Sequence, residues 1–194
     1  MKVSIVKYNA GNIASVQNAL GRLGVESEVT DDADILSHAD KVIFPGVGEA
    51  STAMRYLRER GLDSAIKTLT QPVLGICLGM QLLCSHSEEN DTDCLGIFPN
   101  KVKWLISDDL KIPHMGWNTV SNLRPAMFTG VDENAYVYFV HGYYVETSVE
   151  STATCNYEID FAAAIQRENF YAVQFHPEKS GAVGERILEN FLKL

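Results

Sequence analysis

Two short motifs carry the residues best suited to chemistry, one near the middle of the chain and one near its end. The first, residues 75–79, reads Gly-Ile-Cys-Leu-Gly and stands where an apolar segment passes into a helical pattern. A nucleophile on such a tight strand-to-helix turn is held in strained backbone geometry, and the two glycines let the strand and the helix approach closely. The pattern predicts Cys77 as a nucleophile, although by itself it fits a buried structural cysteine equally well.

A base for this cysteine is predicted at His176, which directly follows an apolar segment at 171–175 and is followed by Pro177 and Glu178. A histidine at the end of one strand can reach a nucleophile at the end of a neighbouring strand, and a carboxylate can fix its tautomer and orientation. Alone, His176 fits a surface histidine at a strand end. Together with Cys77 and Glu178 it predicts a catalytic triad.

Donors for a developing oxyanion are expected after another early strand. Residues 45–48 read Pro-Gly-Val-Gly and precede a helical pattern, so the backbone N–H groups of Val47 and Gly48 are expected to point into the site. The N–H of Leu78 is expected to be a further donor. In isolation the segment fits an ordinary turn. No Gly-Lys-Ser/Thr follows it, so a phosphate-binding loop is not indicated.

The elements that must position these residues alternate between strand and helix through the first half of the chain. Asn12 is expected to cap the first helix. Strands are expected at 2–8, 25–30, 41–44 and 72–76, and helices at 13–23, 31–38, from 49 to 61, in a turn through 66, and from 80. Strands interleaved with helices imply right-handed crossovers and a parallel sheet.

The second half, from 95 to 175, is rich in β-branched and aromatic runs, and a helical pattern over 183–191 closes the chain. These runs predict an antiparallel portion attached to the parallel core. Strands are expected at 136–140, 152–157, 161–166 and 171–175. The fold class is therefore α/β: a three-layer, doubly wound, mostly parallel sheet with helices on both faces and an added antiparallel portion. Residues 1–194 are expected to form a single domain.

The composition excludes several classes of protein. The 194 residues carry 16 Lys and Arg against 25 Asp and Glu, for a net charge of −9. An acidic chain without a basic cluster is not expected to bind nucleic acid. The longest apolar run, over 72–84, is shorter than the ~20 residues of a spanning helix, so no membrane association is expected. Four cysteines without a secretion signal favour a cytoplasmic protein with reduced thiols.

The remaining cysteines and histidines give weaker signals. Cys84, Cys94 and Cys155 have no Cys-x-x-Cys spacing, and with His86 they form no zinc pattern, so no metal is expected. His141 is as readily a packed histidine as a functional one.

The motifs together strongly resemble those of the class I (triad) glutamine amidotransferases. The resemblance rests on residues 75–81 and 175–180, and on the finer markers at 8–12, 45–48, 111–118 and 138–141, so it covers nearly the whole chain. It implies that Cys77 attacks the carboxamide of L-glutamine, that His176 shuttles protons, and that Glu178 orients His176. No cofactor is implied.

The resemblance also implies a binding site for the amino-acid head of glutamine. By position, Gln81 and Glu89 resemble the residues that bind this head, and Gly142 and Tyr143 offer backbone contacts to its carboxylate. The family often carries a hydroxyl residue where Gly142 stands, so here only the backbone contact is expected.

Within the family, the Pro-His-Met-Gly-Trp-Asn segment at 113–118 is similar to that of glutaminase subunits that pass ammonia through a tunnel to a separate (β/α)8-barrel cyclase. This implies a heterodimer, with Trp117 and Lys179 expected at the interface. It also implies that the partner, with its nucleotide substrate bound, activates the glutaminase by reorienting residues 46–48. Three alternatives stay open: the small amidotransferase subunit of pyridoxal phosphate synthase, a stand-alone cysteine hydrolase on the same sheet, and a non-catalytic protein that retains the fold.

Overall fold

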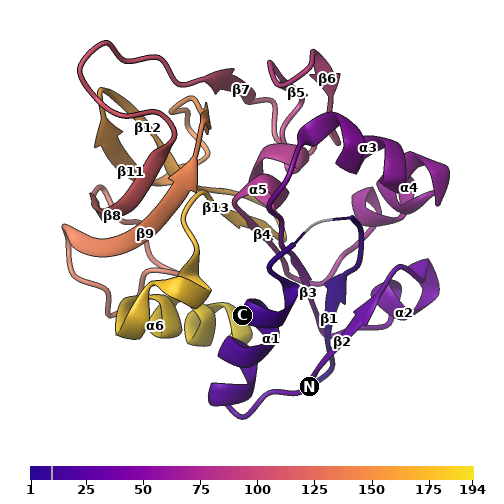
Figure 1. Cartoon of the computed structure of the whole chain (residues 1–194). Coiled ribbons are helices and arrows are strands. Elements are labelled where there is room, and N and C mark those ends of the chain that lie inside the picture. The colour runs from indigo at the N-terminus through magenta and orange to yellow at the C-terminus, as the bar shows by residue number, and fades with distance from the viewer. Residues whose placement is uncertain (10) are drawn as a thin grey trace.

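The computed structural model describes residues 1–9 and 11–194 and shows an α/β fold with helices packed around a central sheet (Figure 1). In chain order the elements are β1 (Val3–Val6), α1 (Ile13–Arg22), β2 (Ser27–Thr30), α2 (Ala33–Ser37), β3 (Lys41–Phe44), α3 (Ala50–Glu59), α4 (Leu62–Lys67), β4 (Val73–Ile76), α5 (Leu78–Leu83), β5 (His86–Ser87), β6 (Thr92–Asp93), β7 (Lys101–Trp104), β8 (His114–Val120), β9 (Ala135–His141), β10 (Tyr143–Val145), β11 (Ser151–Tyr157), β12 (Ile159–Arg167), β13 (Phe170–Val173), the 3-10 helix η1 (Pro177–Lys179) and α6 (Gly181–Leu192).

The central sheet has seven strands in the order β11-β12-β13-β4-β3-β1-β2. From β13 to β2 all neighbouring strands are parallel, whereas β11 and β12 join the sheet in antiparallel fashion. The chain order reverses between β1 and β3, and in such sheets ligands bind beyond the carboxyl ends of the strands at this point. The mostly parallel, doubly wound sheet with an antiparallel portion is the fold class that the sequence predicted.

Alternating side chains of the short strands feed two cores, one on each face of the sheet. Val6 and Phe44 face the core that also contains α3, α4 and α5. Ile5 and Ile43 face the opposite core, which contains α1, α6 and the inner face of β8–β9. Burial on both faces explains why β1, β3 and β4 are almost continuous apolar runs. The fold therefore has the three layers that the sequence predicted: helices, the central sheet, and helices on its other face.

The antiparallel portion is more divided than the sequence predicted. Two small sheets lie apart from the central one, a pair β8-β9 and a four-stranded sheet in the order β10-β7-β5-β6. The strands β5, β6, β7 and β10 contain only two to four residues each. Strands of two or three residues, such as β5, β6 and β10, carry too little periodicity to be recognised, and the four residues of β7 do not form an apolar run.

The first helices of the chain differ in how their starts are capped. Asp32 caps α2, with its side chain accepting hydrogen bonds from the N–H groups of Asp34 and Ile35. Asn12 stands at the N-cap of α1 but makes no side-chain cap bond, so the predicted capping role is wrong. The side chain of Asn12 is used elsewhere, in the site described below.

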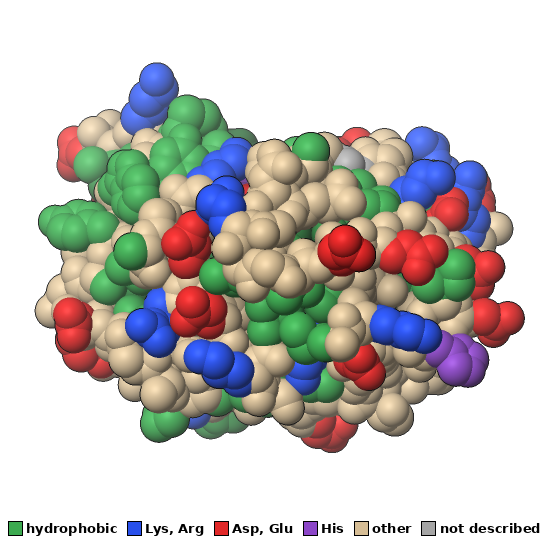
Figure 2. Space-filling view, turned by 90° about the horizontal axis from the view of Figure 1, so that it is seen from below, with side chains coloured by type: hydrophobic (Ala, Val, Ile, Leu, Met, Phe, Trp, Pro, Cys, Tyr) green, Lys and Arg blue, Asp and Glu red, His purple; other side chains and the backbone are tan. Residues whose placement is uncertain are grey.

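No helix among the described residues is both long enough and apolar enough to cross a membrane. Seen from below, the surface carries acidic and basic side chains interspersed, and hydrophobic side chains gather at the upper left (Figure 2). That is the side of the molecule on which β8 and β9 lie in Figure 1.

A close approach of backbones fixes α5 against β3. A Cβ atom added at Gly79 would lie 1.8 Å from the carbonyl oxygen of Phe44, so only glycine fits. We therefore expect Gly79→Ala to lower the free energy of unfolding by about 3 kcal/mol, because backbone and not a flexible side chain must move. Chemical denaturation measures this effect.

Gly21→Ala is the matched control. Gly21 lies in α1, and an added Cβ meets nothing within 4 Å. The control is expected to stabilise the protein by about 0.5–1 kcal/mol, as alanine does in an open helical position. Equal stability of Gly79→Ala and wild type would contradict the packing described.

Candidate active site

Cys77 stands on the predicted tight turn between β4 and α5. Its backbone has φ 53° and ψ −109°, a conformation that costs free energy in a residue with a side chain. Its N–H donates to the carbonyl oxygen of Val173 at 2.8 Å, so β13 holds the turn in place. The sulfur is therefore presented at the carboxyl edge of the central sheet.

The strand order explains why the two motifs meet although they are about 100 residues apart. β13 pairs directly with β4, with Val173 opposite Ile76, so the residues that follow each strand leave the sheet side by side. On the other side of β4 lies β3, which leads into residues 45–48. Three neighbouring strand ends thus deliver the candidate nucleophile, base and oxyanion loop to one place.

His176 and Glu178 form a fully buried pair beside the cysteine. The Nδ1 atom of His176 lies 2.7 Å from Oε1 of Glu178, and neither side chain has exposed area. The Nε2 atom of His176 is buried and has no hydrogen-bond partner among the described residues. The geometry therefore fixes one ring nitrogen through the carboxylate and leaves the other available for a reacting group.

The charge on His176 is favoured by its neighbours. Burial alone would lower its pKa, but the adjacent Cys77 and the hydrogen-bonded carboxylate of Glu178 outweigh burial and raise the pKa of His176 to about 10. The thiol of Cys77 contacts the carbonyl oxygen of Val140 at 3.7 Å. A positively charged imidazole next to this sulfur suits a nucleophilic cysteine.

Asn12 belongs to this site, which the sequence reasoning missed. Its Nδ2 donates to Oε1 of Glu178 at 2.5 Å and lies 3.5 Å from Nδ1 of His176. The signal available was its place after β1, at the switch point of the sheet, where polar loop residues commonly face the ligand. The marker segment 8–12 also contains Ala10, which lies outside the described residues.

A cavity of about 390 Å³ opens onto the sulfur of Cys77. Every residue predicted to bind glutamine or its oxyanion lines it. These residues are Val47, Gly48, Leu78, Gln81, Glu89, Gly142 and Tyr143. Trp117 and Lys179, the residues expected at an interface, do not line the cavity. The residues predicted for glutamine and oxyanion binding therefore line the cavity, and the two residues predicted for an interface lie outside it.

A buried amide network connects the cavity wall to the sulfur. Gln81 donates from Nε2 to the carbonyl oxygen of Tyr143 and to Oε1 of Gln174, both at 3.0 Å. Gln174 in turn donates from Nε2 to the sulfur of Cys77 at 3.6 Å. Gln174 is completely buried and was not predicted; the signal for it was a polar residue inside the apolar strand end that precedes His176.

The N–H of Leu78, predicted to be an oxyanion donor, already has a hydrogen-bond partner in this structure. That group donates to the carbonyl oxygen of Gly46 at 3.3 Å and so is not available to an oxyanion. Gly48, two residues further along the same loop, has φ 136°, a conformation that only glycine adopts readily. The oxyanion loop is therefore placed at the cavity with one of its three expected donors occupied.

Glu89 contributes a carboxylate to the lining of the cavity. Its Oε2 accepts a hydrogen bond from the N–H of Ala50 at 2.7 Å. Burial is the main influence on this carboxyl group and, together with the charge of Glu49, raises its pKa despite that hydrogen bond. A half-buried carboxylate of this kind is suited to binding a cationic group of a ligand.

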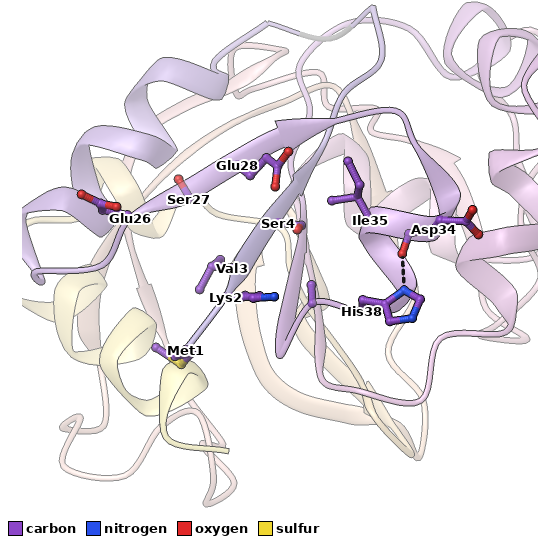
Figure 3. A pocket seen from close by; sticks show the side chains of 11 residues that line it. Met1, Lys2, Val3, Ser4, Glu26, Ser27, Glu28, Asp34, Ile35 and His38 are labelled. Carbon is purple, nitrogen blue, oxygen red and sulfur yellow. Dashed lines mark hydrogen bonds between the residues drawn. The ribbon is translucent and has the colours of Figure 1, made fainter.

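A larger cavity, of about 650 Å³, lies at the other edge of the sheet, around the start of β1 (Figure 3). Its lining includes Lys2, Glu28 and Asp34, and the ring of His38 contacts the backbone oxygen of Asp34 at 2.7 Å. It contains none of the motif residues and lies at the amino ends of the strands, so the smaller cavity is the candidate active site.

Comparison with known proteins places this geometry in a family. The model of the class-I glutamine amidotransferases matches residues 5–194. The chain belongs to this family. The resemblance that the motifs at 75–81 and 175–180 carried is therefore confirmed, and the chain is an enzyme of the amidotransferase type.

Relatives and solved structures agree with this assignment. The amidotransferase is 58% identical to the imidazole glycerol phosphate synthase subunit HisH of Bacteroides fragilis and 48% identical to that of Escherichia coli K12, each over the whole of both chains. A crystal structure described as a glutamine amidotransferase has a TM-score of 0.75 at 18% identity, covering 98% of this chain and 97% of that one. The last comparison supports the fold alone.

Two buried histidines contact each other beside the amidotransferase cavity, and one of them, His141, lines it. His114 and His141 are 3% and 5% exposed, and Nδ1 of His114 lies 3.0 Å from Nε2 of His141. Burial lowers the pKa of His114 from 6.5 to about 4 and, as the largest of several causes, lowers that of His141 to about 3. Both rings are neutral at pH 7.

These shifts predict a loss of stability in acid. Since the folded pKa of His114 lies below its unfolded value, the unfolded chain takes up the proton first as the pH falls. Stability contributed by the neutral ring is complete above pH 6.5 and is lost toward pH 4. We expect His114→Asn to lose less free energy of unfolding over this interval than wild type, by about 3 kcal/mol at most.

Denaturant titrations at half-unit pH steps measure the difference. His38→Asn serves as the control, because His38 is exposed, and it should follow the wild-type curve. Identical slopes for wild type and His114→Asn would show that His114 takes up its proton equally in both states.

Proposed function

We propose that Cys77, His176 and Glu178 hydrolyse L-glutamine to glutamate and ammonia. The observation that carries this proposal is the buried His176–Glu178 pair, whose free Nε2 lies at the same sheet edge as the sulfur of Cys77, in a chain of the glutamine amidotransferase family. Nucleophile, base and orienting carboxylate then have the roles of a triad.

The reaction proceeds in two halves. The sulfur of Cys77 attacks the carboxamide carbon, and the proton of the thiol is held at Nε2 of His176. When the tetrahedral intermediate collapses, His176 gives this proton to the leaving nitrogen, so ammonia departs and a γ-glutamyl thioester remains. Water, deprotonated by His176, then attacks the thioester carbon and releases glutamate and the thiol. Glu178, with the donor of Asn12, keeps the ring oriented throughout.

The cavity suits the amino-acid head of glutamine. We assign its ammonium group to Gln81 and Glu89, and its carboxylate to backbone groups of Gly142 and Tyr143. The carboxylate of Glu89 supplies the negative charge that an ammonium group needs. A space of about 390 Å³ fits one small amino acid.

The oxyanion loop requires a rearrangement before full activity. The Leu78 N–H is bonded to the Gly46 carbonyl, so the peptide following Gly46 must turn away before Leu78, Val47 and Gly48 can act as donors together. We propose that a partner with its nucleotide substrate bound favours the turned form. Glutaminase activity of the isolated chain is then weak and rises when the partner and the nucleotide are added.

The identity of 48–58% with HisH proteins over the full chain assigns the function further. The chain is the glutaminase subunit of an imidazole glycerol phosphate synthase, in histidine biosynthesis. We propose that residues 1–194 form one glutaminase domain and that the ammonia passes to a (β/α)8-barrel cyclase subunit. The four cysteines are free thiols, which supports a place in the cytoplasm.

Replacing the nucleophile tests the proposed chemistry. In the complex with a cyclase, Cys77→Ser is expected to lower glutamine-dependent turnover by about 10³-fold or more, because the triad acts as a unit. Turnover driven by added ammonium salt is expected to survive, since it bypasses the glutaminase.

Cys155→Ser is the matched control, another buried cysteine that lies in β11, away from the cavity. It should keep glutamine-dependent turnover. Retention of glutamine-dependent turnover by Cys77→Ser would exclude the proposed mechanism. If the isolated chain hydrolysed glutamine as fast as the complex, the proposed activation by the partner would be excluded.

The outer face of β8–β9 is the surface we assign to the cyclase. Met115, Trp117 and Tyr136 are 55–61% exposed and lie on this face, where the indole of Trp117 packs edge-on to the ring of Tyr138 at 6.0 Å. Lys179 places its Nζ 6.0 Å from the same Tyr138 ring. Exposed aromatic and Met side chains beside a cation are typical of protein interfaces.

We expect Trp117→Glu to weaken association with the cyclase by about tenfold or more, because a buried charge would replace an aromatic contact. Val149→Glu is the control: Val149 is 82% exposed and apolar but lies in the loop before β11. Titration calorimetry of the two subunits measures both affinities. Equal affinities of the two variants for the cyclase would show that the outer face of β8–β9 is not the interface.

A further inference from the structure

His114 and His141 form a cross-strand pair at the end of the β8–β9 ladder nearest the cavity. They stand directly opposite each other in the register, and both rings point inward. The ring of His114 is stacked between Tyr157 and Phe139, with ring centroids 3.9 Å and 4.8 Å away, so its orientation is held by packing. The proposed mechanism uses neither histidine.

The hydrogen bonds around the pair allow one arrangement of protons. Nδ1 of His141 lies 2.8 Å from the carbonyl oxygen of Tyr143, which can only accept, so Nδ1 carries the hydrogen. Since both rings are neutral, Nε2 of His141 accepts and Nδ1 of His114 donates to it. Nε2 of His114 then accepts from the side-chain amide of Asn118 at 3.4 Å. In this series of hydrogen bonds, each donor is paired with an acceptor.

This series of hydrogen bonds ends at the backbone that we assign to glutamine binding. The carbonyl oxygen of Tyr143 receives two donors, His141 from one side and Gln81 from the other. The carbonyl of Gly142 is held as well, by the N–H of Leu105 at 2.9 Å. Both peptide groups at the start of β10 are therefore fixed, one of them through the histidine pair.

We propose that His114 and His141 are positioning residues for glutamine, which hold the Gly142–Tyr143 backbone in the orientation that binds the substrate carboxylate. The proposal rests on the proposed function. It also gives β8 and β9 two roles: their outer face carries the docking surface, and their inner face carries the pair that sets the substrate site.

The test separates loss of the N–H donor from loss of the ring. His114→Leu and His141→Gln remove the donor at the Nδ1 position, whereas His114→Asn and His141→Asn keep an N–H at that position. In the cyclase complex we expect the first two variants to raise KM for glutamine about tenfold, with kcat changed by less than about threefold. The Asn variants are expected to recover most of the affinity.

Unchanged KM in all four variants would overturn the proposal, as would equal defects in the Leu, Gln and Asn variants, since a merely structural role predicts no rescue. Ammonia-driven turnover of each complex shows that the partner is intact. A wild-type complex that did not use glutamine would instead reject the proposed function.

A second measurement does not depend on the variants' folding. In the wild-type chain labelled with ¹⁵N-histidine, NMR is expected to show both rings neutral and not titrating between pH 6 and pH 8, with Nε2 of His141 unprotonated. Titration within that range, or a proton at Nε2 of His141, would overturn the inference even if the proposed function held.

Discussion

The pairing of β3, β4 and β13 is the constraint on which the site depends. Neighbouring strands in a sheet lie about 4.8 Å apart, so three parallel strands that end at one edge bring their following residues within contact distance. Cys77 follows β4, His176 lies just beyond β13, and the oxyanion loop follows β3. The contact of Gly79 with the Phe44 carbonyl then fixes α5, so the turn that carries the sulfur cannot relax away from the loop.

Burying several polar side chains costs free energy of folding unless each of them has a hydrogen-bond partner. Gln81 and Gln174 satisfy this condition through each other and the Tyr143 carbonyl, and His114 and His141 satisfy it through each other and the same carbonyl. The Nε2 atom of His176 does not: among the described residues it is buried and unpartnered at the reacting edge of the sheet. Within the described part of the chain, Oε2 of Glu178 is likewise buried and unpartnered, so the proposed base and its orienting carboxylate both keep unused hydrogen-bonding capacity at the edge where we propose that the substrate reacts.

The strand β9 connects the proposed docking surface to the segment that carries His176 and Glu178. The backbone N–H of His176 donates to the carbonyl oxygen of Tyr138 at 2.9 Å, and the N–H of Tyr138 donates to the hydroxyl of Ser180 at 3.0 Å. Tyr138 also packs against Trp117 and lies under Lys179 on the outer face. A partner that presses on β9 therefore bears directly on the segment that carries the base and its orienting carboxylate.

The sequence by itself determined the fold class and the short apolar strands β1, β3 and β4, and it predicted the triad, because these depend on local patterns: apolar runs, glycines at a tight turn, and a histidine at a strand end. Through the family resemblance it also predicted Gln81, Glu89, Gly142 and Tyr143 as glutamine-binding residues, and the structure brings them together at one cavity. Only the tertiary structure decided how short elements such as β5 and β10 pair, and that Asn12 serves Glu178 and not its own helix. The same holds for the occupied N–H of Leu78 and for the linked histidines. The contact between Asn12 and Glu178 spans 166 residues and that between His114 and His141 spans 27, and no local pattern encodes a partner at such a separation.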